Sequence, residues 1–359
     1  MDLLYAPSSN SASKMAEQLA PTIQQLEAAA EFGRQASSGI GQVLLVSAGA
    51  GLAIGRSLRC YTDEFGNSLR YREYASATFV DIVRVNSSMA DNAGTLVLLS
   101  SKSGQTPETV EAAKFLKGKA CKVVVFTASE DSPLASFGHP AFFLGETTQP
   151  FHATYMLMVS FLGGVWEMRE NWNLLPALLT SLSELPTAVF LASEKGARSA
   201  EGFAERFKEN HPLYFIASGC AGIVPHAFGL CVLQERFGFD IHAVDGADFF
   251  HSVVETVCPH TEAHYILIIP DDATRNQMLK VKTFLVEQFE EAGVSVEVID
   301  TKEFDMPGID PQVGKFIGPI LAEAFLKPWA PALAKATKKS MDNPLLHMGK
   351  FAYHDCLRA

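Results

Sequence analysis

The sequence has no uninterrupted run of apolar residues long enough to cross a bilayer, and its charged content of 19% is low for a globular protein. Its most apolar stretch, Tyr155 to Trp166, is too short to span a membrane and predicts a buried helix. Residues 1–14 lack the basic start and apolar run of a secretory signal. No predicted strand is followed by a G-x-G-x-x-G turn, which disfavours dinucleotide binding. These absences predict a cytoplasmic protein with no membrane partner.

Metal ligands and disulfides are also not predicted. The six cysteines are scattered, with no C-x-x-C pair and no metal-ligand spacing, so we expect reduced thiols and no metal or cofactor. The net charge is −11, with 29 Lys and Arg against 40 Asp and Glu. An acidic chain is a poor partner for nucleic acid, although a local cradle can still bind a small anion.

The order of predicted elements indicates an α/β protein. The 359 residues are enough for two domains, and the apolar content of 48% predicts substantial cores. Strands alternate with helices, which is typical of parallel sheets covered by helices. Strands are expected at 42–47, 95–99, 121–126, 141–144, 241–244, 265–269 and 294–299, with further strands expected at 69–74 and 81–85. Residues 172–186, rich in Leu, Pro and Ser, are interpreted as a connection between domains, and helices are expected at 155–170 and 188–209.

One design occurs twice in the chain. An apolar strand runs into a turn of small residues and then a helix at 43–53, and the same pattern begins again at Leu213. We interpret this as two copies of one α/β domain. The alternative is a coincidence of two similar openings.

The segment L-L-S-S-K-S-G-Q-T-P-E-T, residues 98–109, carries the densest group of hydroxyls. It lies between a predicted strand and a predicted helix. Pro107 is favourable in the first turn of that helix. Free backbone N–H groups at a helix start, together with hydroxyl donors, form a natural phosphate cradle. Gly104 permits the tight turn, and Lys102 adds a positive charge. The alternative is a helix cap with solvated serines.

The pattern S-x-S-G-x-T-x-E-T after a strand resembles the sugar-phosphate loop of the sugar isomerase (SIS) domain family. The resemblance implies two tandem SIS domains, each a parallel sheet flanked by helices in a flavodoxin-like three-layer sandwich. It implies a helical segment at 1–40, a first SIS domain at 41–186, a second at 187–328 and a closing tail at 329–359. It assigns the sugar phosphate to Ser101, Lys102, Ser103 and Thr106, and the sugar to the turn of Gly49, Ala50 and Gly51.

The catalytic residues come from the same resemblance. A glutamate at a helix end, a strand, and a histidine sixteen residues later resemble the catalytic segment of SIS aldose–ketose enzymes, which implies Glu235 and His251. The chain departs from the family at Asp248, where glutamate is usual, and at Ser252-Val253, where Gly-Pro is common. Lys350 matches a tail lysine that covers the site. The alternative for each of the three, considered without the resemblance, is a solvated or half-buried polar residue with no catalytic role.

The implied function is a deglycase that converts a 6-phosphorylated fructose-amino acid, an Amadori compound, to glucose 6-phosphate and an amino acid. In the family, glutamate carries the proton between carbons 1 and 2, histidine opens the ring, and no metal is needed. The alternatives are an aminosugar-phosphate isomerase or deaminase and a non-catalytic sugar-phosphate sensor. The expected partners are a small sugar phosphate and a second copy of the chain, in a homodimer or larger oligomer.

Overall fold

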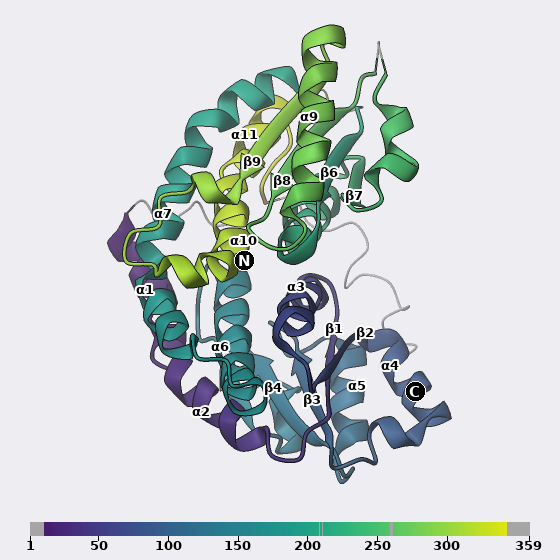
Figure 1. The fold of residues 1–359 in the computed structure, drawn as a ribbon, viewed down its shortest axis with the longest axis vertical. Coiled ribbons are helices and arrows are strands. Elements are labelled where there is room, and N and C mark those ends of the chain that lie inside the picture. Colours follow the sequence, from purple (N-terminus) through teal and green to yellow (C-terminus); the bar gives the residue numbers. More distant parts are fainter. Residues whose placement is uncertain (1–10, 208, 210, 259–260, 343–359) are drawn as a thin grey trace. The chain divides into compact units, whose positions relative to one another are not determined.

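The computed structural model describes residues 11–207, 209, 211–258 and 261–342. It divides into two compact units. The first unit contains residues 16–183, and the second contains 11–15 and 184–342 of the described residues. Helices α1 (Ala12–Ile23) and α7 (Leu175–Arg206) contribute to both units. Each unit is built on its own parallel sheet (Figure 1).

The first unit has a five-stranded sheet in the order β2-β1-β3-β4-β5, with every neighbouring pair parallel. Its strands are β1 (Gln42–Ser47), β2 (Arg70–Ala75), β3 (Thr95–Ser100), β4 (Lys122–Thr127) and β5 (Ala141–Phe143). Its helices are α2 (Leu26–Ala36), α3 (Ala50–Phe65), α4 (Ser76–Val85), α5 (Pro107–Leu116) and α6 (Pro150–Glu170), with short 3₁₀ turns η2 (Ser87–Met89) and η3 (Ala135–Phe137).

The alternation of side chains along buried strands explains why helices cover both faces of this sheet. Leu44, Val97 and Val125 face α4 and α5 in one apolar cluster. The alternate residues of these strands face the opposite side of the sheet, where Phe126 of β4 packs against Phe161 of α6. Strands that are apolar on both faces are typical of parallel sheets with two helical layers.

The second unit has a four-stranded parallel sheet in the order β7-β6-β8-β9. Its strands are β6 (Leu213–Ala217), β7 (Ile241–Asp245), β8 (His264–Ile269) and β9 (Ser295–Asp300). Its helices are η5 (Pro225–Gln234, a π-helix), α8 (Glu235–Phe237), α9 (Arg275–Ala292), α10 (Gly314–Leu326) and α11 (Trp329–Ala336). Its 3₁₀ turns are η4 (Gly219–Gly222), η6 (Phe249–His251), η7 (Val253–Thr256), η8 (Thr301–Glu303) and η9 (Pro311–Val313).

One of the expectations from sequence is wrong. Residues 81–85 form the end of helix α4 rather than a strand, because Phe79, Val80 and Val83 share a helical face that packs on the sheet. The expected connection at 172–186 contains the boundary between the two units, at 183–184, and is mostly helix α7, which continues through Pro186. The missed signal is helical spacing of buried leucines over that segment, at Leu175, Leu178, Leu182 and Leu185.

Helix α7 is also the one helix among the described residues that is long and apolar enough to cross a membrane. Half of its most apolar window is buried inside the protein. Core helices of water-soluble proteins meet the same criterion of length and composition, so this helix is weak evidence for a membrane span.

Glycines allow helices α2 and α6 to touch backbone to backbone. A Cβ atom on Gly33 would collide with the carbonyl of Phe161, and one on Gly164 would collide with the carbonyl of Ala30. The second unit uses the same device, because a Cβ on Gly196 would collide with the carbonyl of Phe325. Since the obstacle in each case is main chain, the neighbouring helix has to move to make room.

We expect Gly164→Val to destabilise the protein by about 1–3 kcal/mol, the scale of overpacking a dense core. Urea unfolding followed by circular dichroism measures the effect. Gly222→Ala is the matched control, because a Cβ at that position meets open space. Equal stability of the two variants would show that the α2–α6 contact tolerates expansion.

Candidate active site

Two predicted binding segments follow neighbouring strands of the first sheet. The chain places β2 on one side of β1 and β3 on the other, so β1 and β3 form the point at which the strand order reverses. The two strands end in register at Ser47 and Ser100, and the Ser47 hydroxyl donates to the carbonyl of Ser100 at 2.7 Å. In open α/β sheets, ligands bind outside the carboxyl ends of strands at this reversal point.

The loop after β3 is held by a glycine that no other residue can replace without strain. Gly104 has φ +63°, and a Cβ there would collide with Ser132 and lie 2.7 Å from the hydroxyl oxygen of Thr127. The loop therefore rests directly on the end of β4 and on the turn that follows it.

Carbonyl groups of this loop are turned toward the protein. The carbonyl of Lys102 accepts from the N–H of Ala128 at 3.0 Å, and the carbonyl of Gly104 accepts from the N–H of Leu134 at 3.0 Å. An anion is repelled by carbonyl oxygens, so their use inside the protein favours an anion near the loop.

Hydroxyl groups and a helix start complete this candidate cradle. The hydroxyls of Ser101 and Thr106 lie 2.8 Å apart, with Ser101 buried and Thr106 half-buried. Ser103 is exposed, and its hydroxyl accepts from the N–H of Gln105 at 3.2 Å. Thr106 begins helix α5 without capping it through its side chain, and Pro107 follows. Donors of α5 and mobile hydroxyls are thus available at one place.

The turn after β1 brings backbone, and no polar side chain, to the same edge of the sheet. Gly49 has φ 54° and precedes helix α3. A Cβ on Gly51 would collide with the Ser47 hydroxyl and lie 3.3 Å from that of Ser100. Helix α3 therefore starts in direct contact with the strand ends, and Ala50 carries the only side-chain carbon of the Gly49–Gly51 turn.

The equivalent point of the second unit is filled by the protein itself. Gly219, with φ 58°, lies two residues after β6, as Gly49 does after β1. The Asp272 carboxylate accepts from the N–H of Cys220 at 2.7 Å, and from the N–H and hydroxyl of Thr274 at 2.8 and 2.6 Å. The run Asp271-Asp-Ala-Thr274 before α9 is a helix-start pattern that signals this role, and sequence reasoning missed it.

Neighbouring charges at this edge of the second sheet are also paired. Arg275 binds Asp300 through two hydrogen bonds of 2.8 and 2.7 Å, and Lys302 lies 2.8 Å from Asp271. Burial opposes ionisation of Asp300, but hydrogen bonds from Arg275 and from the N–H of Lys302 prevail and lower its pKa. Carboxylates therefore hold, in the second unit, positions that hydroxyls hold in the first.

The predicted proton carrier, Glu235, lies before strand β7. It is exposed and follows the π-helix η5, a rare element that is frequent at functional sites. Phe237 packs on Phe239, which packs on Phe207 just before β6. These contacts place Glu235 near the amino-terminal edge of the second sheet.

The predicted ring-opening residue, His251, lies after β7 in the exposed turn η6. This turn is fixed by the Ser218 hydroxyl, which donates to Asp245 at 2.5 Å and accepts from the N–H of Ala247 at 2.9 Å. The buried ring of Phe249 anchors it below. His251 therefore lies at the carboxyl-terminal edge of the sheet.

Within one chain the structure does not bring Glu235 and His251 together. The five residues of β7 separate them, a length of about 16 Å at 3.3 Å per residue. The third predicted residue, Lys350, lies outside the described residues. Over the described part of the chain, no three His, Cys, Asp or Glu side chains form a group able to hold a metal ion.

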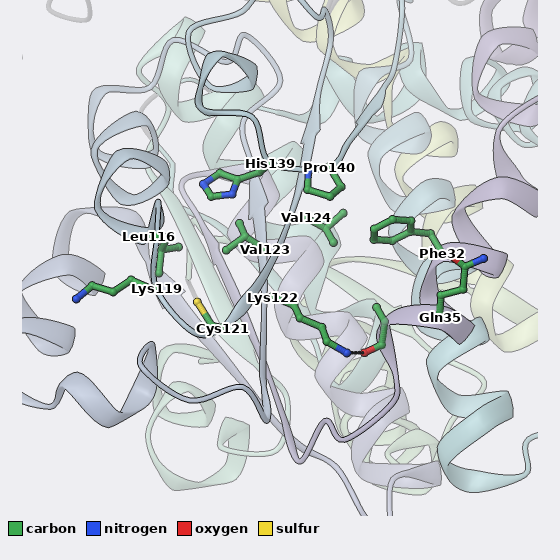
Figure 2. A pocket seen from close by; sticks show the side chains of 12 residues that line it. Phe32, Gln35, Leu116, Lys119, Cys121, Lys122, Val123, Val124, His139 and Pro140 are labelled. Carbon is green, nitrogen blue, oxygen red and sulfur yellow. Dashed lines mark hydrogen bonds between the residues drawn. The ribbon is translucent and has the colours of Figure 1, made fainter.

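A hollow of about 390 Å³ lies elsewhere on the first unit, at the amino-terminal end of β4 (Figure 2). Lys122 at its wall donates to the carbonyls of Ala36 and Ser38 at 2.8 and 2.9 Å. Burial raises the pKa of the Cys121 thiol to about 11, which keeps it protonated. This hollow is at the opposite edge of the sheet from the cradle, and its cysteine is unreactive at neutral pH.

Similarity to known proteins identifies the family of the chain. The sequence model of the SIS domain matches residues 38–162. The chain is 66% identical over 356 residues to the agropine synthesis conjugase of Rhizobium rhizogenes, covering 99% of each chain. The chain belongs to the SIS domain family. It therefore has a sugar-phosphate-related function.

A more distant relative and a solved structure extend the comparison. Fructosamine deglycase FrlB of Bacillus subtilis is 26% identical over 254 residues, which cover 70% of this chain and 74% of the relative. A proposed phosphosugar isomerase of Bacillus subtilis superposes with a TM-score of 0.80 at 23% identity, covering 94% of this chain and 99% of its own. The fold expected from sequence, two SIS-like units with parallel sheets flanked by helices, is confirmed.

Proposed function

We propose that the protein interconverts a 6-phosphorylated fructose-amino acid with glucose 6-phosphate and a free amino acid. The observation that carries this proposal is the open cradle of hydroxyls and helix donors at the strand reversal of the first unit. The names of two relatives support the rest, because one is a conjugase and the other a fructosamine deglycase. We propose that conjugation and deglycation are opposite directions of one reaction in this protein, served by the same residues.

The proposed reaction balances without a redox partner. In the deglycase direction, a proton leaves carbon 1 of the ketoamine to give an enaminol, and a proton is added at carbon 2 to give an aldimine. Water then adds to carbon 1 and the amine leaves, which yields glucose 6-phosphate. Conjugation runs these steps in reverse and releases the water.

Glu235 is the proposed carrier of the proton between carbons 1 and 2, and His251 the proposed acid for opening the sugar ring. Carboxylate and imidazole are suited to these transfers near neutral pH. Lys350 is the proposed third residue, and Gly49 to Gly51 the proposed contact with the sugar.

The proposed assembly follows from the separation along β7. One chain presents Glu235 and His251 at opposite edges of a sheet, so a complete site needs one of them from another chain. We propose a symmetric homodimer or larger oligomer in which His251 serves the site of a neighbouring subunit.

Ser103→Ala should weaken glucose 6-phosphate binding by about 1–3 kcal/mol, the scale of a hydrogen bond to a charged group. Isothermal titration measures the loss. Ser87→Ala is the control, because Ser87 is an exposed serine of the same unit outside the loop. Equal affinity of both variants would remove the loop from the binding site.

Glu235→Gln should reduce turnover by about 10²–10⁴-fold in both directions while leaving affinity nearly intact, because the amide keeps the shape but carries no transferable proton. Assays follow glucose 6-phosphate released from 6-phosphorylated fructose-amino acids, and its consumption with an amino acid. Glu201→Gln, an exposed glutamate of the same unit, is the control. Normal turnover would show Glu235 to be a solvated carboxylate and favour a sensor.

Mixing inactive Glu235→Gln and His251→Asn subunits should restore part of the activity, because hybrid oligomers contain some sites with both native residues. Refolding the two variants together and assaying against each variant alone tests this. Full activity in a sedimenting monomer would contradict it.

A further inference from the structure

A second hollow of the first unit, of about 560 Å³, lies at the amino-terminal edge of its sheet, where β1 and β2 begin. We infer that this hollow binds a small molecule carrying two or more negative charges, through Arg70 and Arg72 of β2. It lies at the opposite end of β1 from the candidate cradle, so this inference does not rest on the proposed function.

The two arginines lie on one face of an edge strand. They are two residues apart, so their Cα atoms are about 7 Å from each other and their side chains leave the same face of the sheet. Both are exposed and both line the hollow. Their spacing suits one ligand with two anionic oxygens or two anionic groups.

No carboxylate neutralises these two guanidinium groups among the residues that the structure describes. The hollow is lined by no acidic residue. The two acids next to lining residues in the sequence are already paired, Glu73 with Arg59 at 2.8 Å and Asp91 with Lys119 at 3.2 Å. In a chain with 40 acidic against 29 basic residues, an acid-free hollow with two arginines is a local reversal of charge.

The asparagines of the hollow present further donors. The Asn92 side-chain oxygen accepts from the N–H of Gly94 at 2.8 Å, and that of Asn86 accepts from the Ser88 hydroxyl at 2.7 Å. The amide NH₂ groups of both asparagines add donors to the two guanidinium groups of the hollow. Two positive charges with further donors beside them favour an anion over a cationic ligand.

Backbone without side chains forms part of the wall. A Cβ on Gly39 or Gly41 would meet no atom within 4 Å, so the space beside them is open. The volume is within the range of small-molecule pockets and exceeds what inorganic phosphate fills. Phosphate monoesters and tricarboxylates both have the required size and charge.

A different role explains exposed arginines on an edge strand, namely blocking the pairing of this edge with another sheet. That role requires no ligand and no free amide donors. Binding measurements separate the two.

Isothermal titration of the full chain with citrate and with glucose 6-phosphate tests the inference. Arg70→Gln/Arg72→Gln should weaken citrate binding at least about tenfold, the scale of losing charged hydrogen bonds. The control is Arg56→Gln/Lys114→Gln, which removes the same charge from exposed positions of the same unit and should keep the affinity. Thermal unfolding without ligand checks that both variants are folded.

The variant Ser103→Ala separates this site from the cradle. Citrate binding that survives Ser103→Ala and is lost in the arginine variant supports the inference, whatever happens to glucose 6-phosphate. Glucose 6-phosphate bound with a second, arginine-dependent stoichiometry identifies a phosphate ester as the ligand class, and citrate alone identifies a carboxylate. Absence of binding to the wild type, equal loss in the control, or loss only in Ser103→Ala would overturn it.

Discussion

The candidate cradle depends on the parallel pairing of β1 with β3. Because the two strands end in register at Ser47 and Ser100, the loops that follow them begin side by side. A slip of one residue would exchange the side chains that pack on the two helical layers, so the packing of both layers fixes the register and with it the loops. Gly51 and Gly104 then let α3 and the β3 loop approach the strand ends without side chains between them.

The strand and helix start on either side of the candidate cradle could be predicted because their information is local. The apolar strand β3, the hydroxyl-rich turn and Pro107 follow one another directly, and hydroxyl residues and proline prefer the start of a helix. Local information was misleading at 81–85, where Val83 and Val85 favour a strand, and at Pro186, which the helix accommodates. In both segments, packing on the sheet outweighed intrinsic propensity.

The positions of Glu235 and His251 in the fold were harder to predict from the sequence. The spacing of Glu235 and His251 is visible in the chain, but their positions at opposite sheet edges follow from the direction of β7, which is a property of the whole sheet. The contact of Asp272 with Thr274 is local, and the helix-start pattern of the sequence indicates it. Its contact with Cys220 joins residues fifty-two positions apart, and a single sequence carries no signal of such a pairing.

The contrast between Asp272 and the hydroxyl loop has a thermodynamic consequence. In the second unit the negative charge belongs to the chain itself, as the carboxylate of Asp272. The N–H groups of Cys220 and Thr274 therefore have a partner whether or not a ligand is bound. In the first unit the counter-charge would come from the proposed ligand, and its binding would stabilise the folded protein by mass action. On this proposal the free energy of unfolding rises with the concentration of that ligand, whereas the contacts of Asp272 contribute to it at any ligand concentration.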